Sequence, residues 1–420
     1  MLAALITFTL SFLYDASATV RGSTQESAAA IGGRLLGDPA VSAAIERIKR
    51  GEPQVLDDQV RLCEIAAPPF KEGRRAEAFR QAFESLGLKS VRIDRAGNVI
   101  GVRPGKAARP NLVFSAHLDT VFGEDVDIKT SRSGSLLKGP GISDDCRGLA
   151  VLLAIIRALE EGRFETGTIT FVGTVGEEGL GDLRGVKELF TGDLKGQIDR
   201  FVSIDGAGAG ITAVGVGVLR YRVSFKGTGG HSYGDFGIAN PIHALGRVVN
   251  RLADLKVPSE PKTTFNVGRI GGGTSINSIA SEAWMEVDLR SSDRVALGAL
   301  DSALQKAVEA ALKDENERWG NRGRLTVTKT LVGNRPAGRV AADAPIVQAA
   351  VSVTRALGLP VSLDEGSTDA NLPMSLGIPA ITIDGGGSAT GTHSTSEVFD
   401  STNSWQGTAR AFLFALALAR

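Results

Sequence analysis

The chain has 420 residues, 42% of them hydrophobic, and its 47 basic side chains balance its 47 acidic ones. This length suffices for two domains with large buried cores. Because no basic block or stripe stands out, we expect no nucleic-acid or membrane-surface partner. The only cysteines are Cys63 and Cys146, which imply no disulfide framework.

An apolar run from Leu2 to Leu13 opens the chain and is followed by Asp15-Ala-Ser-Ala18. A short apolar run before small residues of the Ala-x-Ala type predicts a signal peptide at 1–18 and export to the periplasm or outside the cell. No Lys or Arg precedes the run. The alternative is therefore a cytoplasmic enzyme whose start codon is assigned too far upstream. The run is too short for a stable membrane span.

Short apolar segments that predict buried strands occur in the first and last thirds of the chain. They lie at 112–116, 169–175, 201–204 and 380–383. Residues 149–159 between the first two have a helical pattern, which Glu160-Glu161-Gly162 ends. Strands buried on both faces and separated by helices predict an α/β fold with a mainly parallel, doubly wound sheet.

The middle of the chain has a different periodicity. Apolar and polar residues alternate at 219–226 and, apart from Trp284, at 282–290, as in half-buried antiparallel strands. Amphipathic helices are expected at about 241–255 and from near Ser292 onward. Two strand-helix-strand units of this kind predict an α+β domain inserted into the larger one. The expected divisions are 40–214 with 329–420, and 215–328.

His117 and Asp119 follow the predicted strand 112–116. Residues two positions apart in an extended segment point to the same side. His117 can then bind a metal while Asp119 fixes its other ring nitrogen, directly or through neighbouring backbone. The alternative is a surface His-x-Asp pair without a role.

Asp144-Asp145 lies in a glycine-rich loop, 139–148, that leads into the predicted helix. An ordinary helix N-cap with an acidic first turn explains one aspartate, but not the glycines before it. A carboxylate on a loop at the carboxyl edge of a parallel sheet can bridge two cations. We therefore interpret Asp144 as a metal ligand.

Glu177-Glu178 follows the predicted strand 169–175 and enters the turn Gly179-Leu-Gly181. Adjacent glutamates usually mark a solvated face, as Glu160-Glu161 does. After a buried strand they can divide two tasks, one binding metal and the other acting as a general base.

Asp205 ends the strand 201–204 and opens a glycine-rich turn, 206–210. The glycine spacing is not that of a dinucleotide site and no helix follows, so we keep Asp205 as a metal ligand. His393 follows the strand 380–383, which would bring it to the same sheet edge. His243 lies in an amphipathic helix without acidic or glycine-rich neighbours, and we assign it to packing.

Imidazoles and carboxylates gathered in this way are the ligands that a pair of zinc ions needs, and cobalt and manganese suit them as well. Two zinc ions carry four positive charges. Asp144, Glu178 and Asp205 supply three negative charges, and a bridging hydroxide supplies the fourth. The site would then be close to neutral, as a buried sheet edge favours.

These motifs, their order and the domain inserted between Asp205 and His393 resemble one family over roughly residues 50–420. It comprises the co-catalytic zinc exopeptidases and amidohydrolases, among them peptidase T, carboxypeptidase G, carnosinase, aminoacylase and succinyl-diaminopimelate desuccinylase. The resemblance implies that Asp119 orients His117 and that Glu177 is the general base and later the acid. The implied ligands are His117, Asp144 and Asp205 for one zinc, and Asp144, Glu178 and His393 for the other.

The resemblance also assigns roles to the inserted domain, as a lid and as the contact of a homodimer. His231, in Lys226-Gly-Thr-Gly-Gly-His-Ser, matches a histidine that reaches a partner subunit's site and stabilises the developing oxyanion. Asn277, Arg290 and Arg335 match positions that bind the substrate's carboxylate or carbonyl group.

The chain departs from the family pattern at three places. Asp144-Asp-Cys-Arg147 replaces Asp-Asp-Lys. We expect this change to affect the packing of the loop and the shape of the substrate that the site accepts. Asn277-Ser-Ile-Ala280 lacks the proline of Asn-x-Ile-Pro, and Asp205 in place of Glu is closer to peptidase T than to desuccinylases.

The activity that the resemblance implies is hydrolysis of the amide bond of short peptides by a metal-bridged water. An N-acyl-amino-acid deacylase would use the same chemistry on a different amide. A third alternative is an inactive, metal-free binding or dimerisation module, against which the complete set of ligands argues.

Overall fold

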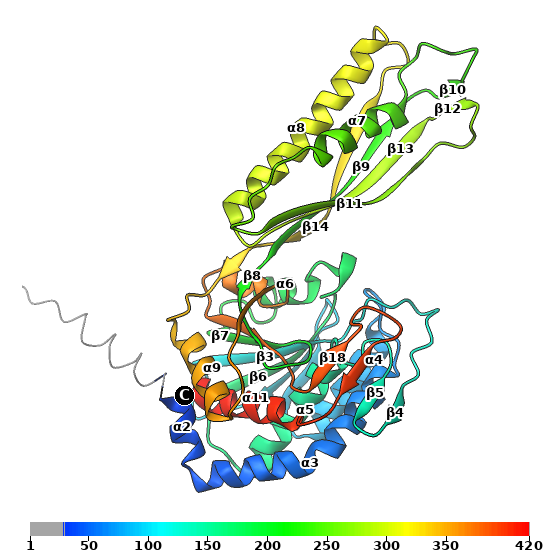
Figure 1. The fold of residues 1–420 in the computed structure, drawn as a ribbon. Helices are drawn as coiled ribbons and strands as arrows, with labels where there is room; N and C mark the ends of the chain where they lie inside the picture. Colours follow the sequence, from blue (N-terminus) through cyan, green and yellow to red (C-terminus); the bar gives the residue numbers. More distant parts are fainter. Residues whose placement is uncertain (1–27, 29, 420) are drawn as a thin grey trace, which may run out of the picture.

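The computed structural model describes residue 28 and residues 30–419 (Figure 1). The predicted signal peptide at 1–18 lies outside the described residues. Among the described residues, we find no helix whose length and apolar character would allow it to cross a bilayer.

The main sheet has a parallel centre. β3 (Asn111–His117) lies between β6 (Thr168–Thr174) and β7 (Arg200–Ile204), and β17 (Ala380–Ile383) follows on the other side of β7. The flanking strands are mostly antiparallel to their neighbours, in the overall order β1-β2-β6-β3-β7-β17-β8-β15, with β16 parallel to β8. The flanking strands are β1 (Lys89–Ile93), β2 (Val99–Arg103), β8 (Ile211–Gly215), β15 (Gly338–Arg339) and β16 (Leu363–Gly366). The predicted mainly parallel sheet is confirmed.

Alternate residues of β3 enter different cores on the two faces of this sheet. Leu112 and Phe114 pack in the large core that contains the apolar side chains of α5 (Cys146–Glu161). Val113 belongs to a second core with Val186 and Leu189 of α6 (Arg184–Thr191). Helices therefore cover both faces, which is why the strand is buried at every position. The other helices are α2 (Ile31–Leu36), α3 (Pro39–Cys63), α4 (Gly73–Ser85), α9 (Pro345–Ala356), α10 (Asn371–Ser375) and α11 (Trp405–Leu418).

A second, fully antiparallel sheet has the order β11-β13-β9-β14. It consists of the two predicted strand-helix-strand units, and α7 and α8 cover one face with a shared apolar core. The units are β9 (Gly217–Lys226), α7 (Pro241–Ala253) and β11 (Thr263–Gly272), then β13 (Glu282–Ser291), α8 (Arg294–Arg318) and β14 (Thr326–Arg335). We call residues 217–335 the inserted unit; it projects from the main sheet (Figure 1). The division at 215 and 328 stays a prediction.

Two chain segments, which we call the neck (residues 215–218 and 335–338), connect the two sheets. Gly215 pairs with Gly338 on the main-sheet side, and Val218 pairs with Arg335 on the other side. The side-chain amide of Asn371 donates to the carbonyl oxygen of Val216 (2.8 Å) and to that of Pro336 (3.1 Å). The first residue of α10 therefore binds both segments of the neck.

Two smaller sheets complete the fold. β10 (Gly230–His231) pairs with β12 (Ser278–Ile279) at the end of the inserted unit that is far from the main sheet (Figure 1). The strands of the other lie in the order β18-β19-β5-β4 and hold the loop 139–145 beside the segment 391–397. These strands are β4 (Ser131–Ser133), β5 (Leu136–Lys138), β18 (Ser388–Thr390) and β19 (Val398–Asp400).

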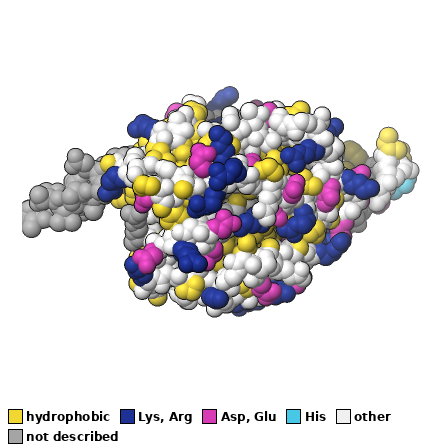
Figure 2. Space-filling model, turned by 90° about the horizontal axis from the view of Figure 1, so that it is seen from below, with side chains coloured by type: hydrophobic (Ala, Val, Ile, Leu, Met, Phe, Trp, Pro, Cys, Tyr) yellow, Lys and Arg dark blue, Asp and Glu magenta, His cyan; other side chains and the backbone are white. Residues whose placement is uncertain are grey.

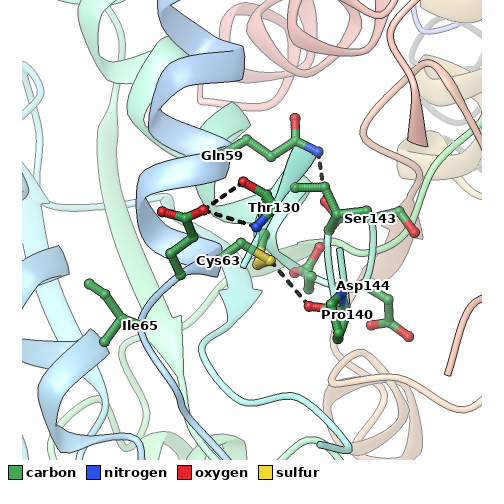
Figure 3. Close-up of a disulfide and its surroundings, with 12 residues drawn as sticks. Gln59, Cys63, Ile65, Thr130, Pro140, Ser143 and Asp144 are labelled. Carbon is green, nitrogen blue, oxygen red and sulfur yellow. Dashed lines mark hydrogen bonds between the residues drawn. A yellow bond between two sulfur atoms is a disulfide. The ribbon is translucent and has the colours of Figure 1, made fainter. Parts of the chain in front are cut away.

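The cysteines correct one expectation from the sequence. Cys63, the last residue of α3, and Cys146, the first of α5, form a disulfide with their Cα atoms 5.4 Å apart (Figure 3). Nearby, the side chain of Gln59 donates to the carbonyl oxygen of Ile142 (2.6 Å). Because the cysteines lie 83 positions apart in the chain, their pairing depends on the packing of α3 on α5. Their number alone could not predict it.

His243 also differs from expectation, since its assignment to packing is wrong. Its side chain is 59% exposed and lies 3.7 Å from Glu315, because it flanks the apolar stripe of α7 that Ala244, Leu245 and Val248 form. On the surface seen in Figure 2, opposite the inserted unit, basic and acidic side chains are interspersed. This mixture agrees with the balanced composition of the chain.

Candidate active site

The candidate ligands meet at the edge where the parallel strands end. His117 is the last residue of β3, Glu178 follows β6, and Asp205 follows β7. Asp144 comes from the loop before α5, and His393 comes from the loop between β18 and β19, where its φ of 64° is a left-handed conformation. Parallel strands bring their carboxyl ends together, so these residues become neighbours through the topology of the sheet.

Asp144 lies between the two histidines. Its Oδ1 is 2.9 Å from Nε2 of His117, and its Oδ2 is 2.9 Å from Nε2 of His393. Glu178 Oε1 lies 2.9 Å from the same His393 nitrogen, and Asp205 Oδ1 lies 3.8 Å from His117 Nε2. Each oxygen of Asp144 thus faces a different histidine, as expected of a carboxylate that bridges two cations.

The donor atoms form overlapping groups, each within 4.8 Å. One group is His117, Asp144 and Asp205, and another is Asp144, Glu178 and His393, the two sets that the resemblance implies. A third contains His117 and Glu178 together with Glu177. Imidazole nitrogens with carboxylate oxygens suit zinc, manganese and cobalt, so the residues present fit a pair of such ions.

Asp119 organises two of the ligand segments. Its backbone oxygen lies 3.0 Å from Nδ1 of His117, and its carboxylate oxygen lies 3.7 Å from the same nitrogen. The carboxylate accepts hydrogen bonds from the backbone N–H groups of Glu177 (3.0 Å) and Glu178 (2.8 Å). Asp119 therefore connects the histidine to the glutamate pair.

Two further carboxylates hold the loop that carries Asp144. Asp145 accepts from the backbone N–H groups of His117 and Gly148, both at 3.0 Å. Glu397, fully buried, accepts from the N–H groups of Gly141 (3.0 Å) and Ser143 (2.8 Å). Sequence reasoning missed Glu397, because its only signal was its position four residues after His393.

Burial dominates the electrostatics of the cluster. It raises the pKa of Asp205 and of Asp145 well above the usual aspartate value. Burial alone would lower the pKa of His117, but Asp144, Asp145 and Asp205 outweigh it and raise that pKa well above its usual value. Hydrogen bonds to Asp144 and Glu178 raise the pKa of His393 to about 10. Bound cations would replace the protons that these groups otherwise hold.

Glu177 has a different environment from its neighbour Glu178. Nη1 of Arg335 lies 2.8 Å from Oε1 of Glu177, and Nη2 donates to the Glu177 backbone oxygen. Burial raises the pKa of Glu177 to about 8, although Arg335 and His117 act in the opposite direction. A carboxyl group with a pKa near neutrality can both accept and return a proton.

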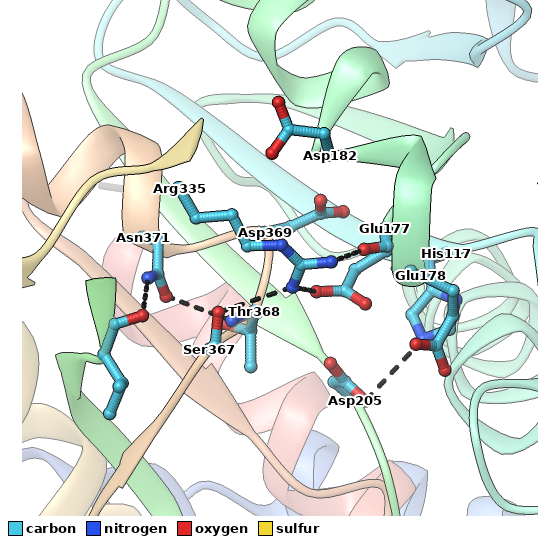
Figure 4. Close-up of polar contacts among 12 residues, drawn as sticks. His117, Glu177, Glu178, Asp182, Asp205, Arg335, Ser367, Thr368, Asp369 and Asn371 are labelled. Atoms are coloured by element: carbon cyan, nitrogen blue, oxygen red, sulfur yellow. Dashed lines mark hydrogen bonds and ion pairs between the residues drawn. The ribbon is translucent and has the colours of Figure 1, made fainter. Parts of the chain in front are cut away.

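Asp369 is a second residue that sequence reasoning missed. It is buried near Arg335 (Figure 4), and its Oδ2 accepts from the hydroxyl of Thr174 (2.5 Å). Within the described chain its Oδ1 has no hydrogen-bond partner. The only signal in the sequence is the short polar segment Gly366-Ser-Thr-Asp369, which resembles any turn.

A cavity of about 280 Å³ adjoins the ligands. Arg290 and Arg335, two of the predicted substrate-binding residues, line it together with Arg220, which the sequence did not single out. The other lining residues are Asp144, Glu177, Glu178, Gly179, Asp205, Thr212, Ser367, Thr368, Thr382, Asp384 and His393.

The structure does not bring His231 and Asn277 to this cavity within one chain. His231 lies on β10, and Asn277 immediately precedes β12, at the far end of the inserted unit (Figure 1). The His231 side chain is exposed there, and its Nδ1 accepts from the backbone N–H of Gly234 (3.2 Å).

Comparisons with known proteins assign this chain to a family. The model of "Peptidase family M20/M25/M40" matches residues 113–417. The uncharacterized protein YqjE of Bacillus subtilis is 25% identical over 347 residues, which are 79% of this chain and 90% of YqjE. Succinyl-diaminopimelate desuccinylase of Corynebacterium glutamicum is 25% identical over 252 residues, 57% of this chain and 66% of that protein.

Solved structures agree on the fold. Aminopeptidase PepT from Bacillus cereus superposes with a TM-score of 0.68 at 21% identity, over 87% of this chain and 98% of that chain. This likeness spans both the main sheet and the inserted unit, as the predicted fold class requires. The family model covers well over half of the sequence. The chain is therefore a member of peptidase family M20/M25/M40, the group of hydrolases that its sequence resembles.

Proposed function

We propose that this M20-family hydrolase is a dinuclear zinc metallopeptidase that cleaves the amide bond of short peptides. The observation that carries the proposal is Asp144, whose two oxygens face His117 and His393 at 2.9 Å each. His117, Asp144 and Asp205 would hold one ion, and Asp144, Glu178 and His393 the other. Bound zinc supplies Lewis acidity toward the scissile carbonyl and toward water; cobalt and manganese fit the same donors.

Glu177 is the residue to which we assign proton transfer. Its carboxylate takes a proton from the attacking water and delivers it to the leaving amine. Arg335 holds the carboxylate at 2.8 Å, and Asp119 holds the backbone N–H of the same residue at 3.0 Å. One contact holds the side chain of Glu177 and the other its backbone, which favours a defined position for proton transfer.

His231 and Asn277 would act in the site of a partner subunit, because both lie far from the ligands of their own chain. Three large apolar side chains close to them in sequence are exposed: Tyr233 at 89%, Phe236 at 72% and Ile276 at 103%. Exposed apolar side chains gathered in this way are typical of a protein interface. They support a homodimer in which His231 stabilises the oxyanion and Asn277 contacts the substrate.

A deacylase acting on N-acyl amino acids is the second candidate. The relative from Corynebacterium glutamicum is named for the removal of a succinyl group, whereas the PepT structure is that of an aminopeptidase. Both reactions hydrolyse an amide, so the same ligands and base would serve either. Screening di- and tripeptides against N-acetyl amino acids with the metal-loaded protein distinguishes the two.

Export from the cytoplasm is a further part of the proposal. It rests on the apolar run and small-residue site at 1–18, outside the described residues. The Cys63–Cys146 disulfide supports it, because disulfides persist in oxidising compartments. Fractionation of cells, with mass measurement of the mature N-terminus, tests it; a full-length chain in the cytoplasm would contradict export.

The metal centre and the base are tested with one variant. Glu177→Gln removes the proton acceptor but no predicted ligand, so metal content should stay at about two ions per chain while kcat falls about 100- to 10,000-fold. Elemental analysis and steady-state kinetics on a peptide substrate measure both quantities.

Glu161→Gln is the matched control, since Glu161 also belongs to an adjacent glutamate pair but lies exposed at the end of α5. It should leave kcat unchanged. Full activity in Glu177→Gln would overturn the assignment of the base. A chain that retains no metal after metal-supplemented purification would instead favour a metal-free binding module.

A further inference from the structure

The open face of the second sheet carries a group of three charged side chains next to the cavity. Asp288 of β13 pairs in register with Arg220 of β9, and Arg290 lies two residues further along β13. Oδ1 of Asp288 accepts from Nε of Arg220 (2.9 Å), and Oδ2 accepts from Nε of Arg290 (2.6 Å). We call these residues the Arg220–Asp288–Arg290 triad; one carboxylate is shared by two guanidinium groups.

The carboxylate of the triad is held in its charged form. Burial alone would raise the pKa of Asp288, but hydrogen bonds from Arg290 and Arg220 outweigh it and lower the pKa below its usual value. The triad therefore combines two positive charges with one negative charge and has a net charge of +1. Within the described chain, the terminal nitrogens of Arg290 donate to no other residue.

Arg220 has a fixed position at the boundary between the inserted unit and the ligand loops. Its Nη1 donates to the backbone oxygen of Gly179 (2.6 Å), the residue after Glu178. On β14 its register partner is Gly333, where a Cβ would lie 3.2 Å from side-chain carbon atoms of Arg220. Glycine at this position thus leaves room for the arginine, whose side chain is only 19% exposed.

The cavity has two separate cationic positions. Arg335 of β14 and Arg290 of β13 both pair with the same stretch of β9, each opposite Val218. Their Cα atoms are therefore two strand spacings apart, about 10 Å. Arg335 is engaged by Glu177, whereas the triad keeps an unbalanced positive charge. A second carboxylate on the substrate would neutralise that charge with charge-assisted hydrogen bonds.

We propose that the Arg220–Asp288–Arg290 triad recognises a side-chain carboxylate, so that the enzyme acts on amides of acidic amino acids. The inference rests on the proposed amide hydrolysis and names its substrate class. Arg220 is a specificity-determining residue, and Asp288 is a positioning residue that orients both guanidinium groups.

A second charged group on the same face of the sheet lies away from the cavity and serves as a structural comparison for the triad. Glu286, in register with Arg222, accepts from Arg222 (2.8 Å) and from Arg269 (3.0 Å). Arg222 also lies over the ring of Trp284, with its guanidinium carbon 3.9 Å from the ring centroid. Like the triad, this group joins one carboxylate to two guanidinium groups, and Arg222 lies on β9 as Arg220 does. Its members do not line the cavity. Arg222 is therefore the matched control for Arg220.

The test compares Arg220→Met with Arg222→Met on paired substrates in which Glu is exchanged for isosteric Gln. The pairs are N-acetyl-Glu with N-acetyl-Gln, Ala-Glu with Ala-Gln, and Glu-Ala with Gln-Ala. In the metal-loaded wild type, kcat/KM for the preferred Glu substrate should exceed that for its Gln partner about 10- to 100-fold, the effect of one charged hydrogen bond. Arg220→Met should bring this ratio close to one, and Arg222→Met should keep it.

Binding provides a readout that needs no turnover. Calorimetry with free glutamate and glutamine should show a preference for glutamate in the wild type and in Arg222→Met, and its loss in Arg220→Met. A wild type that treats Glu and Gln alike in both measurements, or an Arg220→Met variant that keeps the preference, overturns the proposal. If no amide is hydrolysed by the metal-loaded wild type, the proposed function fails, and the binding preference alone decides on the triad.

Discussion

Arg335 and burial act in opposite directions on Glu177. Burial raises the pKa of this carboxyl group, and the guanidinium 2.8 Å away lowers it, with a result of about 8. The general base that we propose works only when it is ionised, so activity should rise with pH as Glu177 loses its proton. Arg335 thus helps to determine the pH at which the base becomes available.

Replacing Arg335 with methionine should move the acidic limb of the pH profile of kcat/KM to higher pH. The sign follows from charge: without the guanidinium, burial acts on Glu177 unopposed by Arg335, and its pKa rises further. Arg335→Lys, which keeps the charge, should shift the limb less. Arg339→Met, four residues further along the chain and not in the cavity lining, should not shift it; an unmoved limb in Arg335→Met would contradict this role.

The sequence predicts residues that follow strands better than residues that support them. His117, Glu178 and Asp205 come directly after apolar segments, and the parallel arrangement of those segments brings them together. Glu397 and Asp369 contact the site only through tertiary packing, and nothing local distinguishes them from ordinary polar residues. The same holds for Arg220, which belongs to a strand whose alternation indicates only an exposed face.

For the helices and strands, the spacing of apolar residues along the sequence predicted most of the elements that the structure shows. The alternation at 219–226 and the apolar segment 112–116 correspond to β9 and β3, with ends shifted by one or two residues. The sheet β18-β19-β5-β4 was not predicted, because strands of three residues are too short to show a period. The disulfide was missed for a related reason, since it depends on two helices packing together.

The disulfide connects α3 to the helix that begins two residues after Asp144. Replacing both cysteines with serine should lower the free energy of unfolding by about 2–5 kcal/mol, because the crosslink restricts the unfolded chain. It should also speed the loss of bound metal to a chelator, because the loop 139–145 is then less restrained. Thermal unfolding and chelator kinetics measure the two effects.

The reducing agent TCEP provides the control for this pair. It should destabilise the wild type but leave the Cys63→Ser/Cys146→Ser variant unaffected. Two titratable thiols per chain in denatured, unreduced wild-type protein would show that the bond is absent.

At the scale of the whole molecule, the sequence predicted an inserted α+β unit but not how it is attached. The change of periodicity after residue 215 was visible, whereas the neck depends on pairing between segments more than a hundred residues apart. The sequence likewise could not predict the distance between His231 and the ligands. Because His231 lies far from the ligands of its own chain, mixing two variants can test whether it acts in the site of a partner subunit.

Mixing two inactive variants should restore activity if His231 serves a partner's site. In a dimer of Glu177→Gln with His231→Ala, one of the two sites combines an intact Glu177 with an intact His231 from the other subunit. Random exchange of subunits then gives about a quarter of wild-type activity. Each variant alone is the control, and a mixture no more active than its components would show that His231 does not serve a partner's site.

The neck has a mechanical consequence. Asn371 binds both of its segments, so a rotation of the inserted unit would have its pivot there. β9 extends ten residues from this point, a lever arm of about 30 Å. A swing of about ten degrees would move the far end, with His231, by about 5 Å, and Arg290 near the pivot by only about 1 Å. The arginines could thus keep hold of a substrate through a motion that brings the distal histidine into or out of reach.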